Sequence, residues 1–455
     1  MDTNDTTGLL RFVTAGSVDD GKSTLIGRLL LDSKGLFDDQ LTAVQAASRK
    51  RGFAQADLSL LTDGLIAERE QGITIDVAYR YFATPARKFV IGDTPGHVQY
   101  TRNMVTAAST ADVAVLLVDA TRGVQTQTRR HAYLARWLGI PRIVLAVNKM
   151  DLVDTDAAAA FDAIRAAFER FAAPLGFTHV QAIPLSALRG DMVVERGDAF
   201  GWYQGPTLLQ HLETVPARHD DAATAGAPLR LPVQRVVRVA RGNAQPGALA
   251  EATEFRGYQG TVAAGTMAVG DEVVVLPSNM RARIAAVLGA DGPLAAAGPD
   301  RAVTVQLDRE VDVSRGDVIA AARDTPALAT DIVADLCWFD PQPLDARRPY
   351  LVKHGARTVR ARFADVAWRI DVDTLARLPA EAPLEVNDVA RVRLRTQVPL
   401  PLEPYARSRA GGAFIVIDEA TNRTVAAGTV VSPTNAATEP ASDGAAAAVS
   451  LGVSA

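Results

Sequence analysis

The sequence is poor in cysteine. Cys337 is the only cysteine among 455 residues, so no internal disulfide can form. A single thiol is typical of a reducing compartment, and we expect a cytoplasmic protein. No apolar run approaches the ~20 residues that a membrane-spanning helix needs. Residues 1–7 are polar and acidic and lack the basic head and apolar run of a secretory signal, so we expect neither a membrane span nor export.

An excess of positive charge is lacking as well. The chain has 48 Lys and Arg against 52 Asp and Glu, a formal net charge of −4, whereas a nucleic-acid surface usually needs a basic excess. We therefore expect no nucleic-acid partner. Clusters of cysteine, histidine or carboxylate with the spacing of metal ligands are also missing from the sequence, which leaves Mg²⁺ at the motifs described next as the only metal that we infer.

A glycine-rich stretch near the N-terminus follows an apolar strand pattern and leads into a helical pattern, which is the context of a phosphate-binding P-loop. Gly16 and Gly21 let the backbone turn so that successive N–H groups face inward, and the helix N-terminus adds its free N–H groups. Lys22 supplies a cation for the β- and γ-phosphates, and the Ser23 hydroxyl is placed to ligate Mg²⁺. The predicted phosphate site comprises Gly16, Ser17, Val18, Asp19, Asp20, Gly21, Lys22, Ser23 and Thr24.

A second motif, Asp93-Thr94-Pro95-Gly96, follows another apolar strand pattern. Asp93 would hold Mg²⁺, directly or through water, and the Gly96 N–H could donate to the γ-phosphate. Thr74 is a candidate second hydroxyl ligand of Mg²⁺, ordered when the γ-phosphate is present. His97 either orients the attacking water or is a surface histidine after a tight turn, and its position alone does not decide between the two.

The motif Asn148-Lys149-Met150-Asp151 is typical of a guanine-binding site. The Asp151 carboxylate can accept hydrogen bonds from guanine N1–H and the 2-amino group, and adenine lacks both donors. Such a site rejects the wrong base by up to ~10⁴–10⁵. Lys149 would lie along the base plane, and Ser186-Ala187-Leu188 fits the loop whose backbone contacts the guanine oxygen. Behind a P-loop, these motifs predict GTP with Mg²⁺ rather than ATP.

Strand and helix patterns alternate over residues 9–215, which predicts an α/β P-loop G domain with a mainly parallel sheet and helices on both faces. Ligands then bind at the carboxyl ends of the strands, where all the motifs above fall. The expected strands are 10–15, 77–82, 88–92, 113–118, 142–147 and 180–184. The expected helices are 22–31, 99–108, 126–138 and 157–171.

Residues 216–228 are polar and indicate a linker. Beyond it, short strand patterns are separated by Gly-, Pro- and Asp-rich turns, and this even spacing favours small closed barrels. We expect two all-β barrel domains, domain II at 229–326 and domain III at 327–433, and a disordered tail at 434–455. The expected strands include 231–239, 260–264, 272–276, 282–287, 302–307, 318–321, 359–369, 389–396 and 413–417.

The motifs together resemble the translation-factor class of GTPases. The resemblance is carried by the P-loop, by Gly72-Ile73-Thr74-Ile75, by 93–97 and by 148–151. In that class a G domain precedes two β-barrels. The resemblance implies that His97 positions the attacking water, and that Val18 and Ile73 form an apolar gate beside it.

Within this class, the sequence is most similar to the large, GTP-hydrolysing subunits of bacterial sulfate adenylyltransferases. The run 63–82 is the most specific, and the similarity extends over about residues 9–432. Further matching stretches are 37–41, 99–104, 255–257 and 270–273. Val98 and Leu31 depart from the usual pattern, and neither has a nucleotide-binding role.

The resemblance implies a partnership. A separate small subunit would bind ATP and sulfate and make adenosine 5′-phosphosulfate and diphosphate, while this chain supplies GTP hydrolysis in a heterodimer. The sequence itself shows no sulfate or ATP site and no second Gly-x-x-x-x-Gly-Lys. Two alternatives stay open: a translation GTPase that carries an aminoacyl-tRNA, and a GTP-gated scaffold without coupled chemistry.

Overall fold

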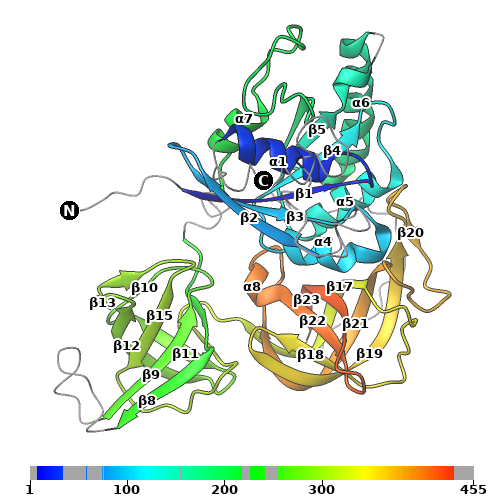
Figure 1. Cartoon of the computed structure of the whole chain (residues 1–455). Helices are drawn as coiled ribbons and strands as arrows, with labels where there is room; N and C mark the ends of the chain where they lie inside the picture. The colour runs from blue at the N-terminus through cyan, green and yellow to red at the C-terminus, as the bar shows by residue number, and fades with distance from the viewer. Residues whose placement is uncertain are drawn as a thin grey trace. The chain divides into compact units, whose positions relative to one another are not determined.

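The computed structural model describes residues 8–33, 58, 74, 76–153, 156–217, 226–240 and 254–434. These residues form two compact units, which divide near residue 218 except that the first also includes Asp371–Ala376. Figure 1 shows the elements of both. None of the described helices is both long and apolar enough to cross a membrane. Of the expected tail 434–455, Thr434 is instead the last residue of a strand, and residues 435–455 lie outside the described residues, as do residues 218–225 of the expected linker 216–228.

The first unit is built on a six-stranded sheet with the order β2-β3-β1-β4-β5-β6. All neighbours are parallel except β2 and β3, which are antiparallel, so the predicted mainly parallel sheet is confirmed. Every residue of β4 is buried, as expected for a central strand covered on both faces. The strands are β1 (Leu9–Gly16), β2 (Ala78–Ala83), β3 (Lys88–Asp93), β4 (Val113–Asp119), β5 (Arg142–Asn148) and β6 (His179–Pro184).

Helices cover both faces of this sheet. In Figure 1, α1 and α7 lie on one side of it and α4 and α5 on the other. The helices are α1 (Lys22–Asp32), α4 (Thr101–Ala108), α5 (Thr126–Trp137), α6 (Ala157–Ala172) and α7 (Leu208–Thr214), with 3₁₀ turns η2 (Val98–Tyr100), η3 (Met150–Leu152) and η4 (Ala173–Leu175). The sequence analysis missed α7, although Thr207 and Gln210 form a capping box at its start.

The first part of the second unit is an antiparallel sheet with the order β7-β16-β11-β12-β15-β9-β8, and β13 pairs with β12. A bridge between Arg230 of β7 and Ala264, which follows β9, links the first strand in this order to the segment after the last but one. The strands pack around one apolar core. Its strands are β7 (Arg230–Pro232), β8 (Arg235–Ala240), β9 (Glu254–Thr261), β10 (Met267–Ala268), β11 (Glu272–Leu276), β12 (Met280–Gly289), β13 (Gly292–Leu294), β14 (Ala296–Ala297), β15 (Ala302–Leu307) and β16 (Val318–Ala321).

The prediction of a single strand at 231–239 is wrong. The structure has two strands there, β7 and β8, which pair with β16 and β9 respectively. The chain changes partner between them at Val233 and Gln234, so one apolar run serves two ladders. The expected strand 260–264 is also displaced, because β9 ends at Thr261.

The second part of the second unit is a closed barrel. Six strands close the ring in the order β18-β22-β23-β17-β21-β19, and β19 pairs back with β18. Closure removes the free sheet edges and surrounds a core that includes Trp338, Tyr350 and Phe363. The elements are β17 (Ala327–Trp338), β18 (Tyr350–His354), β19 (Arg357–Ile370), β20 (Arg377–Leu378), β21 (Val389–Leu402), α8 (Arg409–Gly412), β22 (Ala413–Asp418) and β23 (Thr424–Thr434).

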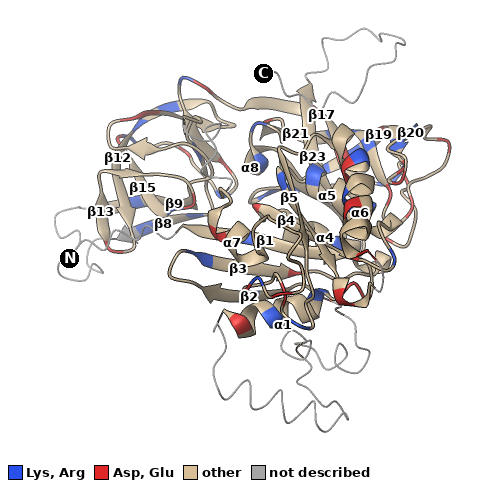
Figure 2. Ribbon diagram, turned by 90° about the horizontal axis from the view of Figure 1, so that it is seen from above, with Lys and Arg blue, Asp and Glu red and all other residues tan. Residues whose placement is uncertain are grey.

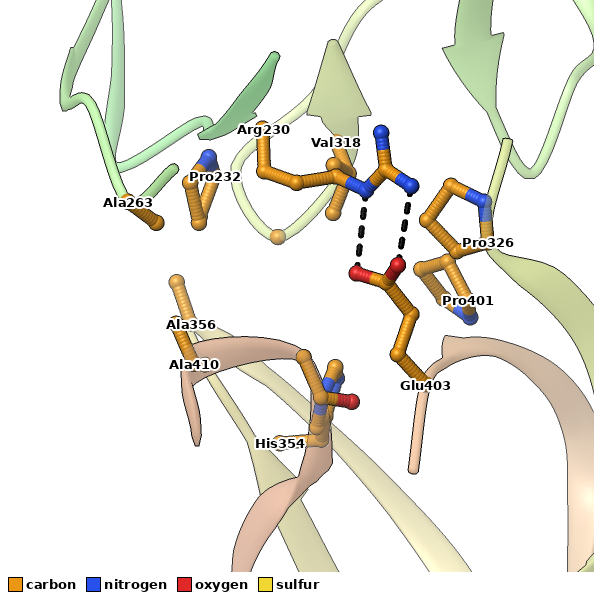
Figure 3. A pocket seen from close by; sticks show the side chains of 13 residues that line it. Arg230, Pro232, Ala263, Val318, Pro326, His354, Ala356, Pro401, Glu403 and Ala410 are labelled. Atoms are coloured by element: carbon orange, nitrogen blue, oxygen red, sulfur yellow. Dashed lines mark hydrogen bonds and ion pairs between the residues drawn. The ribbon is translucent and has the colours of Figure 1, made fainter. Parts of the chain in front are cut away.

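A buried ion pair joins the two sheets of the second unit (Figure 3). The Arg230 guanidinium donates from Nε to Glu403 Oε2 at 2.9 Å and from Nη2 to Glu403 Oε1 at 2.8 Å. Both residues are almost fully buried, and Arg230 also donates to the Asp324 side chain at 2.9 Å. Such a two-bond pair fixes the orientation of both partners.

Candidate functional site

The P-loop follows β1 and turns into α1 at Gly21, whose φ is +92°. A Cβ at Gly21 would lie 2.4 Å from Asn148 Nδ2, so the approach of Asn148 and the backbone conformation both require glycine here. Within the loop, the Asp20 carboxylate accepts a hydrogen bond from the Ser17 N–H at 2.6 Å. Burial raises the pKa of Asp20, and the nearby Lys22 ammonium opposes that rise.

Lys22 is buried beneath this loop. Its Nζ donates to the carbonyls of Ser17 at 2.7 Å and Gly16 at 3.2 Å. Burial lowers the pKa of Lys22, and the carboxylate of Asp93 counteracts that shift most. A Cβ at Gly96 would lie 2.6 Å from Lys22 Nζ and 3.0 Å from the Ser17 carbonyl oxygen. The motif 93–96 therefore packs directly against the P-loop.

Asp93 ends β3 with a side chain that is only 1% exposed. Its Oδ1 accepts a hydrogen bond from the Thr14 hydroxyl at 3.3 Å, and the Thr94 hydroxyl donates to the Thr14 carbonyl at 2.6 Å. A carboxylate at Asp93 and a hydroxyl at Ser23 are oxygen ligands of the kind that Mg²⁺ prefers. Both residues flank Lys22 in the site, so the donor set fits a magnesium–nucleotide complex. Among the described residues, no cluster of three or more His, Cys, Asp or Glu could hold another metal.

Asn148 connects the two halves of the site. Its Nδ2 donates to the Asp20 carbonyl at 2.8 Å, and its Oδ1 accepts from the Ala187 N–H at 2.9 Å. Because Asn148 is 2% exposed, both bonds are shielded from water. One side chain thus holds the P-loop and the loop at 186–188 in a fixed relation.

Lys149 and Asp151 extend this second half. Lys149, with φ +60°, forms an ion pair from Nζ to Asp119 Oδ2 at 2.8 Å. The Asp151 side chain is 7% exposed and lies 3.7 Å from Arg189 Nε. Met150 is buried in the core, so its side chain contributes packing.

Arg28 of α1 fastens the loop at 186–188 from below. Its Nε donates to the Ala187 carbonyl at 3.2 Å and its Nη2 to the Leu188 carbonyl at 2.5 Å. Its Nη1 pairs with Asp32 at 3.5 Å. The loop is thereby held by Arg28 at two carbonyls and by Asn148 at the Ala187 N–H.

His97 precedes the turn η2, with an edge-on ring contact to Tyr100 at 6.2 Å. It is partly exposed, as is Val18 in the P-loop, and the Val18 carbonyl accepts a hydrogen bond from Arg122 at 3.2 Å. Thr74 is partly exposed and forms no hydrogen bond with another described residue. Ile73 and the expected stretches 37–41 and 63–73 lie outside the described residues, so the apolar gate stays a prediction.

Four charged residues around the site were missed by the sequence analysis: Arg28, Asp119, Arg122 and Arg189. Asp119 ends β4 directly opposite Asn148 in the parallel register of β4 and β5. A carboxylate at the end of a buried apolar strand was the available signal. The three arginines gave none, because their partners are distant in sequence.

Comparison with known proteins identifies the relatives of this chain. Residues 7–217 match the model of the elongation factor Tu GTP binding domain, and residues 331–431 match a GTP-eEF1A C-terminal domain-like model. The chain is 54% identical to the bifunctional enzyme CysN/CysC of Mycobacterium tuberculosis over 95% of its own length and 69% of that protein. It is 46% identical to sulfate adenylyltransferase subunit 1 of Laribacter hongkongensis over 94% of its length and 86% of that protein.

A solved structure of sup35 with GDP aligns with 94% of the chain at 23% identity and a TM-score of 0.42. Sulfate adenylyltransferase subunit 1 of Cellvibrio japonicus is 48% identical over 93% of the chain and 86% of that protein. The chain belongs to the family of sulfate adenylyltransferase subunit 1, whose N-terminal domain is a GTPase domain of the elongation factor Tu type.

Proposed function

We propose that this chain hydrolyses GTP to GDP and phosphate, and that this reaction drives the conversion of ATP and sulfate into adenosine 5′-phosphosulfate and diphosphate on a small ATP-binding partner subunit. The observation that carries the proposal is the bridge made by Asn148 between the P-loop and the guanine-binding loop. The relatives named sulfate adenylyltransferase subunit 1 supply the coupled reaction.

The residues of the chain divide the work on GTP. The P-loop N–H groups and Lys22 would bind the phosphates, and Asp151 would accept from guanine N1–H and the 2-amino group. Ser23, Asp93 and Thr74 would hold Mg²⁺, which neutralises charge on the β- and γ-phosphates when bound. His97 would orient the attacking water. Lys149 would lie along the base, held by Asp119 at 2.8 Å.

Coupling to a second nucleotide is physically sensible because the phosphosulfate anhydride is unfavourable to form. The test is adenosine phosphosulfate synthesis by the chain and its partner subunit from ATP and sulfate, with GTP, with GDP or with neither. We expect synthesis to rise with GTP, and GTP turnover to rise with ATP and sulfate. GTP hydrolysis that is indifferent to both would instead indicate a scaffold, and copurification with RNA would indicate a translation GTPase.

A further inference from the structure

The outer face of the closed barrel carries an ordered set of charges on three adjacent strands, β17, β21 and β19. Figure 2 shows charged residues of both signs spread over the ribbons of the molecule. Arginines on β21 are paired in register with one residue on each neighbouring strand. The three rungs are Asp331–Arg395–Arg362, Val333–Arg393–Asp365 and Asp335–Arg391–Trp368.

In two of these rungs the central arginine has a stabilising neighbour, on both sides for Arg391 and on one side for Arg393. Arg391 pairs with Asp335 at 2.8 Å and lies 5.0 Å from the centre of the Trp368 ring, a cation–π distance. Arg393 faces Asp365, with 3.8 Å between Nε and Oδ2. Opposite charges or an aromatic ring across the ladder stabilise a sheet.

The third rung breaks this pattern. Arg395 pairs with Asp331 at 2.7 Å, but on its other side it faces Arg362, and like charges directly opposite each other destabilise a sheet. No acidic side chain among the described residues lies within ion-pair distance of Arg362. A glutamate at 362 would face Arg395 with the opposite charge, so Arg362 does not stabilise this rung.

Arg362 opens into a groove of about 520 Å³ that is also lined by Arg360, Arg395, Gln397 and Glu419. The one acid in the groove is already used, because Glu419 accepts from Arg360 Nε at 2.7 Å. Among the described residues, Arg362 is therefore the cation of the groove that has no acidic partner, and the Gln397 side chain lines the same groove.

We infer that this groove is a docking site for a carboxylate side chain of the partner subunit, which pairs with Arg362. The inference rests on the proposed function, because that function supplies the partner. A nucleic acid fits less well, since its closely spaced phosphates would meet Glu419, Asp331 and Asp365 along the same face. A single Asp or Glu needs only one free guanidinium, and the pair becomes strong when the interface excludes water.

The test compares Arg362→Glu with Arg393→Glu in the full chain. Both substitutions change the net charge equally on the same face, but Arg393 lies outside the groove. In Arg362→Glu the new carboxylate would face Arg395, so the thermal unfolding temperature of this variant should equal or exceed that of the wild type. Its dissociation constant for the partner subunit, measured by titration calorimetry, should nevertheless rise ~10-fold or more. Arg393→Glu would face Asp365, so it should unfold at a lower temperature and bind the partner within about twofold of wild type.

Arg362→Lys keeps the charge and should retain most of the affinity. Unchanged partner binding by Arg362→Glu, or an equal loss in both glutamate variants, would overturn the inference. Loss of binding to a stem-loop RNA with intact subunit binding would overturn it too and would assign the groove to nucleic acid. GTP hydrolysis by the chain alone separates this result from the proposed function: a chain that cannot hydrolyse GTP refutes that function whatever the groove binds.

Discussion

Removing the side chain that joins the two halves of the nucleotide site should weaken GTP binding sharply. Asn148→Ala deletes the hydrogen bonds to the Asp20 carbonyl and from the Ala187 N–H, which measure 2.8 and 2.9 Å. Each buried group left without a partner costs ~1–3 kcal/mol, so the two together cost ~2–6 kcal/mol. Without nucleotide the two loops can relax, whereas a bound nucleotide needs both in place. The free energy of GTP binding should therefore become less favourable by at least the lower figure.

At ~1.4 kcal/mol per tenfold, that lower figure corresponds to a dissociation constant for GTP raised about 30-fold. Titration of a fluorescent GTP analogue measures it, and Asn148→Asp separates the two bonds because it retains only the acceptor for Ala187. Gln204→Ala is the matched control, since that exposed amide donates only to Gly201 in its own loop at 3.0 Å. A GTP affinity of Asn148→Ala within threefold of wild type would refute the role of the bridge.

Three further changes test other parts of the site and the fold. Asp151→Asn should shift the preferred base from guanine to xanthine, by ~100-fold or more in the ratio of dissociation constants; an unchanged GTP preference contradicts the base-reading role. His97→Ala should slow single-turnover hydrolysis ~10²–10⁴-fold with little change in GTP affinity, and an equal loss in both would make the residue structural. Burial, and secondarily His179, lowers the pKa of His211 to about 4. Its neutral form thus stabilises the fold fully above the unfolded pKa of about 6.5, and that contribution is lost as pH falls from there toward 4. The urea midpoint should therefore drop between pH 7 and 5, less so in His211→Gln.

The sequence predicts the first unit well because its motifs and its strands support each other. Each binding loop follows a buried apolar strand, so a motif in the sequence also marks where the preceding strand ends. Contacts that depend on the order of the strands in the sheet cannot be predicted in this way. Lys149 meets Asp119 because β4 and β5 are neighbours in parallel register, and Arg28 meets Leu188 across 160 residues of sequence. The local sequence pattern predicts neither of these two contacts.

The β-rich unit is less predictable for a physical reason. A run such as 231–239 satisfies strand propensity throughout, and only the arrangement of the completed sheet decides that β7 and β8 pair with different partners. The odd cross-strand pair of Arg362 and Arg395 is invisible for the same reason, because the alignment of strands is a property of the closed ring.

The ion pair between Arg230 and Glu403 bears on how the second unit responds to force or to a ligand. Its two charges are enclosed, and removing either partner would leave an uncompensated buried charge, at a cost of ~3–5 kcal/mol. The two β-rich segments of the second unit should consequently move together. A displacement of either segment should therefore be passed on to the other.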